Sequence, residues 1–266
     1  MPFKDLFRDR NNPFSFFSDT GGKKPKTPKT HIRTADAAIT RVIADNMAFM
    51  EDHPLEGFFD HFLDQQTPFA TLVLCSDSRC QLEAFCSQPF NSIFEVSNAG
   101  NRFKADMFSV SFGVKVLKTP LLLIIGHTDC GAIKAAMADH SKLDAEIQAG
   151  LDGLNLPAHS QPGDDTATYN SKVLVNVIAN VNAQVRAAVD TYSKQVADGN
   201  LSVVGALFDI HNLLGHGNGK LHIFNVSGET AIDKLHMHKT LRHLSDAEKK
   251  LTLLDISKAM PVINNI

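Results

Sequence analysis

Residues 71–79 read TLVLCSDSR, and residues 121–130 read LLLIIGHTDC. In both segments a run of branched and leucine residues, typical of a buried strand, ends where polar residues begin. Binding sites of open parallel sheets form at the carboxyl ends of the strands, which is where these polar residues fall. The two segments supply Cys75, His127 and Cys130, which are zinc-type ligands. Because a structural zinc usually takes four protein ligands, a set of three predicts a catalytic metal site with one open position.

The apolar residues along the chain alternate between strand and helix patterns. Strands are predicted at residues 70–75, 92–96, 121–126, 201–208 and 220–226, and helices at residues 35–64 (in two pieces around Pro54), 105–118, 132–140 and 170–197. A polar stretch at residues 150–168 predicts a loop or insertion. This alternation is typical of an α/β fold. We expect a central, mainly parallel sheet of four strands plus an antiparallel edge strand, flanked by helices.

Length, charge and cysteine content narrow the class of protein. The chain has 266 residues, 43% of them hydrophobic, which suits one catalytic domain with extensions. With 26 basic and 29 acidic residues, the formal charge is −3, and the sequence shows no excess of positive charge of the kind that binds nucleic acid or an anionic membrane. A small-molecule substrate is therefore favoured over these partners. The first thirty residues lack a secretory apolar run, and no segment is apolar enough to span a membrane. We therefore expect reduced thiols and a cytoplasmic location.

Composition divides the chain into three parts. Residues 1–34 are expected to form a flexible or docking N-terminal arm, with a basic linker at residues 21–29 and a phenylalanine-rich stretch before it. Residues 35–228 carry the predicted sheet and both ligand motifs, and they are expected to form the zinc-dependent catalytic domain. Residues 229–266 are expected to form a helical C-terminal extension. The roles of the arm and of the extension stay open.

The four cysteines differ in their surroundings. Single cysteines are commonly buried hydrophobic residues, and we interpret Cys80 and Cys86 in that way because neither has a metal-ligand neighbour at useful spacing. Cys75 and Cys130 are different. A Cys-x-Asp-x-Arg motif after one strand and a His-x-x-Cys motif after another make a specific combination.

These motifs resemble those of a known family. CSDSR at residues 75–79 and GHTDCGA at residues 126–132 are similar to the two zinc motifs of the β-class carbonic anhydrases. The resemblance extends over about residues 55–228, and it includes further matches at Gln66-Thr-Pro68, Ser97-Asn-Ala-Gly-Asn101, Asn176 to Val185 and Val204-Gly-Ala-Leu-Phe-Asp209. Several matches in the right order make a chance likeness improbable.

The resemblance implies a fold, a cofactor and an activity. It implies one zinc per chain, held by Cys75, His127 and Cys130, and reversible hydration of carbon dioxide to bicarbonate and a proton by zinc-bound hydroxide. Such an enzyme is a lyase (carbonate dehydratase). Self-association as a homodimer or homotetramer, with dimerisation through the N-terminal helices, is also implied.

Other side chains acquire candidate roles around the metal. Asp77 has two possible positions: it either ligates zinc in a closed form, or pairs with Arg79 and leaves the fourth position open. The resemblance assigns Gln66 and the Gly131 backbone N–H to hydrogen bonds with the substrate oxygens. Asp129 is expected by default to cap the following helix, with ligand orientation as the alternative. Three histidines, namely His211, His216 and His222, are possible proton shuttles, and none is preferred.

The chain departs from the family at three positions. Some members bind bicarbonate in a regulatory pocket built from tryptophan, arginine and tyrosine, where this chain has Leu72, Ser97 and Phe208. We therefore expect this pocket to be lost, regulation by bicarbonate to be weak, and the open form to be favoured.

Two alternative functions use the same residues. One is hydrolysis of a sulfur analogue, carbonyl sulfide or carbon disulfide, on the same metal site, and the sequence separates it poorly from carbon dioxide hydration. The other is a zinc scaffold without turnover. The presence of Asp77, Arg79 and Gln66 argues against a scaffold, because a purely structural metal needs none of them.

Overall fold

The computed structural model describes residues 34–53, 58, 64–154, 156–159, 161 and 163–259. The chain divides into two units, Met1–Gln65 and Gln66–Ile266. In the first unit, α1 (Ala35–Asp52) confirms the predicted first helix, and none of its side chains is buried. The N-terminal arm and nearly all of the helix predicted after Pro54 lie outside the described residues.

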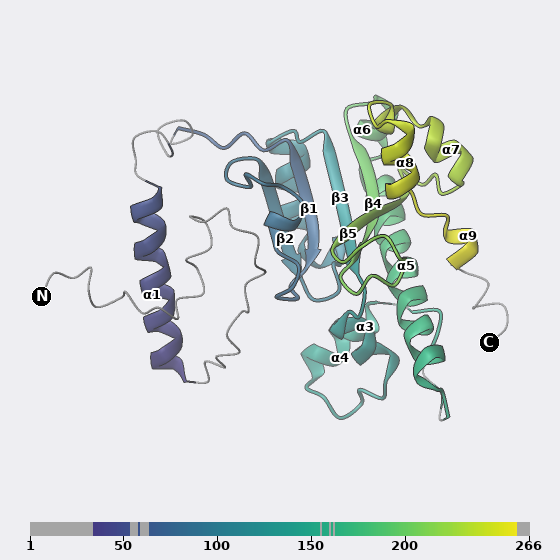
Figure 1. Ribbon diagram of the computed structural model, residues 1–266, viewed down its shortest axis with the longest axis horizontal. Helices are drawn as coiled ribbons and strands as arrows, with labels where there is room; N and C mark the ends of the chain where they lie inside the picture. Colours follow the sequence, from purple (N-terminus) through teal and green to yellow (C-terminus); the bar gives the residue numbers. More distant parts are fainter. Residues whose placement is uncertain are drawn as a thin grey trace, which may run out of the picture. The chain divides into compact units, whose positions relative to one another are not determined.

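The second unit is built on a five-stranded sheet (Figure 1). Its strands are β1 (Ala70–Cys75), β2 (Ile93–Asn98), β3 (Leu121–His127), β4 (Ser202–Asp209) and β5 (Lys220–Val226). In the order β2-β1-β3-β4-β5 every neighbouring pair is parallel except β4 and β5. The predicted α/β fold with one antiparallel edge strand is therefore confirmed.

The helices between the strands follow the predicted order with different boundaries. The segment predicted at 105–118 consists of a 3₁₀ turn (Phe103–Asp106), α2 (Met107–Ser111) and a π-helical turn (Phe112–Val116). After β3 come α3 (Gly131–Met137), α4 (Ala145–Asp152), α5 (Thr166–Thr191) and α6 (Ser193–Ala197). The long helix begins four residues earlier than predicted, because the Asp165 carboxylate accepts a hydrogen bond from the Thr168 backbone N–H and caps its first turn.

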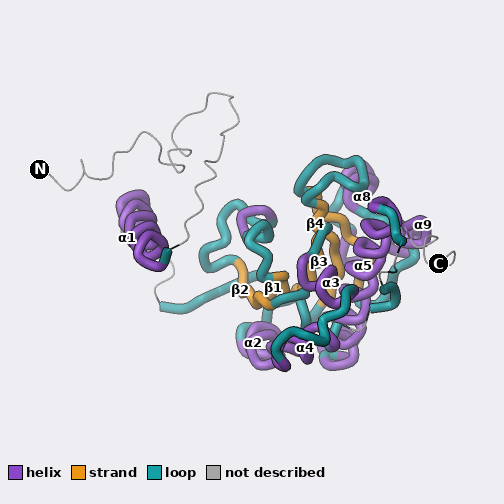
Figure 2. The backbone as a smooth tube through the Cα atoms, turned by 90° about the horizontal axis from the view of Figure 1, so that it is seen from below, coloured by secondary structure: helices purple, strands orange, loops and turns teal. Residues whose placement is uncertain are grey.

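Helix α5 covers one face of β3 and β4 (Figure 2). Its buried side chains belong to the largest apolar cluster of the described residues. On the opposite face, Leu72, Leu74, Ile125 and Phe208 form a second cluster. Residues Leu235 and Leu241 of the C-terminal extension pack with Val204 and Val226 in a third cluster. The sheet is thus covered on both faces, as parallel strands require.

The described residues after β5 form several short helices. It contains α7 (Ile232–Met237), a 3₁₀ turn (Lys239–Leu241), α8 (Asp246–Thr252) and α9 (Ile256–Ala259). Ser245 and Glu248 form a capping box that starts α8, and both α7 and α8 contact β5. Among the described residues, no helix combines the length and apolarity needed to cross a bilayer.

Helix α5 approaches the sheet closely because two strand residues opposite it are glycines. A Cβ atom at Gly126 would lie 2.7 Å from Val177 Cγ1 and 2.8 Å from Val181 Cγ2. At Gly205 it would lie 2.9 Å from both Val181 Cγ1 and Val185 Cγ2. Real Cβ atoms are not found this close to other carbons, so these glycines set the distance between helix and sheet.

We expect Gly126→Ala to lower the free energy of unfolding by about 1–3 kcal/mol, because the added methyl group overpacks the core. Urea unfolding followed by circular dichroism measures this change. The control is Gly150→Ala in α4, where the new Cβ would meet only the Arg102 Nη2 atom at an ordinary 3.7 Å. Equal stability of Gly126→Ala and the wild-type chain would show that α5 can move away without cost.

Candidate metal centre

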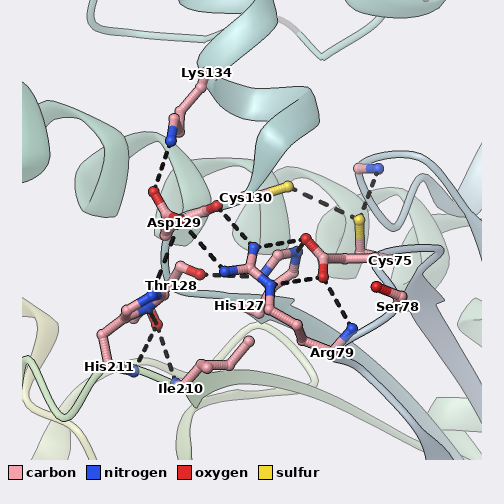
Figure 3. Close-up of polar contacts among 12 residues, drawn as sticks. Cys75, Ser78, Arg79, His127, Thr128, Asp129, Cys130, Lys134, Ile210 and His211 are labelled. Carbon is pink, nitrogen blue, oxygen red and sulfur yellow. Dashed lines mark hydrogen bonds and ion pairs between the residues drawn. The ribbon is translucent and has the colours of Figure 1, made fainter. Parts of the chain in front are cut away.

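Three buried ligand atoms converge at the carboxyl-terminal edge of the sheet. β1 and β3 pair in parallel from Ala70 with Leu121 onward, so their last residues, Cys75 and His127, reach the same edge. Cys130 follows as the N-cap residue of α3. One ligand atom from each of the three lies within 4.8 Å of the others. The two sulfurs are 3.9 Å apart and face each other in Figure 3.

The His127 ring is oriented for a ligand at Nε2. Its Nδ1 atom lies 3.0 Å from the Thr128 carbonyl oxygen, and because a carbonyl only accepts, Nδ1 must carry the proton. In this tautomer Nε2 carries no proton and has a free lone pair. The atom is buried, and it has no hydrogen-bond partner among the described residues. A buried polar atom without a partner normally signals a missing ligand or ion. The imidazole therefore fits a metal bound at Nε2.

The two thiols share their protons unequally. Hydrogen bonds from the Cys130 thiol and from the Gly100 N–H, 3.5 Å away, lower the pKa of Cys75. Conversely, the neighbouring Cys75 thiolate and burial raise the pKa of Cys130. Without a cation, one proton therefore remains between the sulfurs. A metal ion would displace it, so metal affinity should rise with pH.

Asp77 is held beside this cluster by Arg79. Arg79 Nε donates to Asp77 Oδ1 at 2.8 Å, Nη2 donates to Oδ2 at 2.7 Å, and the Arg79 backbone N–H donates to Oδ1 at 3.0 Å. These hydrogen bonds hold the pKa of the Asp77 carboxyl well below its usual range, so it is ionised at neutral pH. Asp77 Oδ2 lies 3.8 Å from His127 Nε2, so the carboxylate is next to the ligand cluster while it is bound by the guanidinium.

Asp129 does not cap a helix, contrary to the default expectation. It adopts a left-handed conformation (φ 61°), and the N-cap of α3 is Cys130, without a side-chain capping bond. Instead, its Oδ1 accepts a hydrogen bond from Lys134 Nζ at 2.8 Å, and its Oδ2 lies 3.4 Å from Arg79 Nη1 (Figure 3). Sequence reasoning did not include Lys134, although its position one turn into the helix after the motif was a possible signal.

The two predicted substrate-binding groups lie in different surroundings. Gly131 is the first residue of α3, directly after the ligand Cys130, and no atom lies within 4 Å of the place where a Cβ would be. Apart from its chain neighbours and the backbone of its own helix, the space on the Cβ side of Gly131 is therefore open among the described residues. Gln66 is exposed in the segment before β1, and in the part of the chain that the structure describes no hydrogen bond joins it to the cluster.

The three candidate histidines occupy two places. His211 Nδ1 is 3.1 Å from Thr128 Oγ1, and His211 Nε2 is 3.9 Å from Asp129 Oδ2, so this ring reaches the edge of the site. His216 and His222 lie together, with their ring centroids 5.4 Å apart. Burial lowers the pKa of His222.

The three positions that depart from the family form no polar pocket. Leu72 and Phe208 are buried in the same apolar cluster, and Phe208 contacts Phe85 edge-on with centroids 5.0 Å apart. The Ser97 hydroxyl donates to Glu95 Oε1 at 2.8 Å. Two of the three positions that are polar or amphipathic in some family members are therefore occupied here by buried apolar side chains.

The remaining cysteines stay apart from the cluster. Burial raises the pKa of the Cys80 thiol to about 12, while the half-buried Cys86 thiol donates to the Gln88 carbonyl oxygen. All four cysteines are free of disulfides. Among the described residues, the group of Cys75, His127 and Cys130 is the one set of three such side chains that could hold a metal ion.

Comparison with known proteins identifies relatives. A family model described as carbonic anhydrase matches residues 70–220. A carbonic anhydrase of Mycolicibacterium smegmatis is 35% identical over 103 residues, which are 37% of this chain and 48% of that protein, so the match spans about half of this relative. Carbonic anhydrase 2 of Mycobacterium tuberculosis is 26% identical over 167 residues, 62% of this chain and 80% of that protein.

Solved structures share the fold. Crystal structures of tetrameric β-carbonic anhydrases from Sordaria macrospora align with a TM-score of 0.56 at 21% identity, covering 71% of this chain and 96% of theirs. The Coccomyxa β-carbonic anhydrase in complex with acetazolamide aligns with a TM-score of 0.52 at 23% identity, covering 80% of this chain and 92% of its own.

Proposed function

The chain belongs to the β-class carbonic anhydrase family, and from this premise we propose that it is a zinc enzyme that reversibly hydrates carbon dioxide to bicarbonate and a proton. The observation that carries the proposal is the convergence of Cys75, His127 and Cys130 at one edge of the sheet, with the Asp77–Arg79 pair beside them. A metal site of three protein ligands with an ionised carboxylate next to it suits catalysis better than structural support.

Zinc is the metal that this donor set favours. Thiolate and imidazole ligands select zinc over magnesium or calcium, which prefer oxygen. One ion per chain would be held by the two sulfurs and His127 Nε2. When bound, zinc supplies a Lewis acid that lowers the pKa of water from about 15.7 towards 7.

The residues around the metal then have separable roles. Arg79 keeps Asp77 ionised and holds both of its carboxylate oxygens, which leaves the fourth ligand position to solvent. Asp77 remains available as a hydrogen-bond acceptor next to that position. Gln66 and the Gly131 N–H are proposed to donate to the substrate oxygens, by resemblance to the family. The open space around Gly131 supports its part.

A stopped-flow hydration assay across pH, with zinc measured on the same sample, tests this function. We expect about one zinc per chain and activity already near neutrality. Because the pKa of Asp77 is lowered, its ion pair with Arg79 persists throughout the range between pH 5 and 9. A rise in activity with pH would therefore report ionisation of water and not of Asp77. Activity confined to alkaline pH would contradict the open arrangement, and faster turnover of carbonyl sulfide than of carbon dioxide would contradict the substrate.

We expect regulation by bicarbonate to be weak. Leu72, Phe208 and the engaged Ser97 hydroxyl offer no cationic or free polar group to a second bicarbonate ion. The absorption spectrum of cobalt in the cobalt-substituted protein should therefore not change on titration with bicarbonate beyond the change expected for product binding at the metal. A second, saturable spectral change that disappears in Phe208→Leu would contradict this expectation.

Self-association and organisation complete the proposal. Ile39, Val42, Ile43 and Met47 form an exposed apolar stripe along α1, which supports assembly into a dimer or tetramer through this helix. Analytical ultracentrifugation showing only monomer would refute it.

Residues 35–228 are proposed as the catalytic domain and residues 229–266 as an accessory extension that covers β5. Four free cysteines support a reducing, cytoplasmic location.

A further inference from the structure

A hollow lies away from the metal centre, beside α4 and α5. We call it the Arg102 pocket. It has a volume of about 340 Å³, and its walls come from the turn after β2, the end of α4 and one side of α5. Arg102 and Lys104 line it, together with Gly153, Gln184 and three alanines, and no acidic side chain takes part. The pocket therefore concentrates two positive charges without a counter-charge.

The Arg102 guanidinium has no partner in the described parts of the chain. Its Nε atom is fully buried and makes no hydrogen bond. Lys104 is exposed, and no hydrogen bond or ion pair between described residues holds its ammonium in another place. Buried donors of a charged group that lack a partner are rare in folded proteins, because desolvating them is costly. Nε itself has no surface that a ligand could touch, so a ligand in the hollow would be held by the other donors of the guanidinium, which line it, and by Lys104.

The pocket is held rigidly although its charges are unpaired. The Asn98 side chain grips the Arg102 backbone from both sides: Oδ1 accepts from the Arg102 N–H at 2.7 Å, and Nδ2 donates to the Arg102 carbonyl oxygen at 3.0 Å. Gly153 leaves room for the guanidinium, because a Cβ there would lie only 3.3 Å from Arg102 Nη1. Because the Arg102 backbone is already fixed and Gly153 leaves space for the guanidinium, binding a ligand would cost little conformational entropy of the protein.

We propose that the Arg102 pocket binds a small multivalent oxyanion of the phosphate class. The planar guanidinium provides a fork of donors that matches tetrahedral oxyanions, and Lys104 adds a point charge. The hollow exceeds the size of one phosphate group, so it also admits a small phosphorylated molecule. A polynucleotide is disfavoured, because the chain carries a net charge of −3 and the two cations are confined to one pocket.

This site is separate from the metal centre but connected to it by hydrogen bonds. Gln184 in the pocket wall donates to Asn180 Oδ1 at 3.0 Å, and Asn180 Nδ2 donates to the Gly100 carbonyl oxygen at 2.9 Å. The Gly100 N–H in turn points to Cys75 Sγ at 3.5 Å. None of the pocket residues is a metal ligand, so binding here is distinguishable from anion binding at the metal.

Isothermal titration of the zinc-loaded, full-length protein with inorganic phosphate tests the proposal. We expect saturable binding that weakens as sodium chloride is raised, since the attraction is electrostatic. Arg102→Gln should weaken the affinity about 10-fold or more, because it removes a charge-assisted pair of hydrogen bonds, and Lys104→Gln should weaken it about 3-fold. Bicarbonate, with one charge, should bind more weakly than phosphate.

A matched control and a second variant keep the result interpretable. Lys250→Ala removes one positive charge from α8, which contacts the opposite edge strand β5, and it should leave phosphate binding unchanged. Ala183→Glu places a carboxylate on the exposed side of α5 within the pocket and should abolish binding even if Arg102→Gln fails to fold. Phosphate binding that survives both Arg102→Gln and Ala183→Glu, or an absence of saturable binding at millimolar phosphate, would overturn the proposal.

Discussion

Cys75→Ser should lose its zinc and its hydration activity while the chain stays folded. A serine hydroxyl is a poor zinc ligand at neutral pH, so the ion would keep only His127 and Cys130. Loss of a Lewis acid worth several kcal/mol corresponds to a fall of kcat/KM by about 10³-fold or more. Metal content by atomic emission and stopped-flow hydration on the same sample measure both parts.

The fold should survive this substitution because serine nearly matches cysteine in size. Cys75 belongs to the apolar cluster between the sheet and α5, so burial of a hydroxyl there should cost about 1–3 kcal/mol. The matched control is Cys86→Ser, which changes a half-buried thiol outside the site and should retain full zinc and activity. If Cys75→Ser unfolds whereas the wild-type protein shows only background hydration, the metal is a structural element and the enzyme proposal fails.

Much of this architecture could be predicted because it depends on local sequence. The strands are short runs of valine, isoleucine and leucine, and parallel pairing brings their carboxyl ends together whatever the intervening loops do. That rule alone placed Cys75 and His127 side by side. The Asp77–Arg79 pair was also predictable, since the two residues are separated by one position and their charges are opposite.

The parts that were missed depend on contacts between distant residues or on unusual backbone conformations. Asp129 reaches Lys134 and Arg79 because its backbone is left-handed, a conformation that aspartate tolerates but that its presence in the sequence does not dictate. Helix α4 has only eight residues, so its apolar positions cover little more than two turns, too few for a helical period to stand out in the sequence. The loop that follows α4 is fixed on α5 by an ion pair at 2.9 Å between the buried Lys172 and the half-buried Asp164, a contact that composition does not reveal.

Arg79→Ala should convert the open site into a closed one. Without the guanidinium, Asp77 loses its two side-chain hydrogen bonds and its charge partner, although Oδ2 remains 3.8 Å from His127 Nε2. The released carboxylate would then be free to take the fourth ligand position. We expect activity at pH 7 to fall about 10- to 100-fold, with zinc content unchanged. Activity should recover at alkaline pH, where hydroxide competes with the carboxylate.

Two further variants separate this closure from simple loss of a charge. Arg79→Lys keeps the positive charge but cannot form the bidentate pair, so we expect an intermediate loss. The double substitution Asp77→Ala with Arg79→Ala removes the competing carboxylate, and X-ray absorption at the zinc edge should then detect no carboxylate ligand at any pH. The sign of the pH effect distinguishes the two explanations.

Arg79 keeps the pKa of Asp77 low, so in the wild-type protein acid breaks the Asp77–Arg79 pair only far below neutrality. A loss of activity between pH 8 and 6 therefore cannot come from protonation of Asp77. If Arg79→Ala keeps the wild-type pH profile and shows no new oxygen ligand at zinc, Arg79 does not control the position of Asp77.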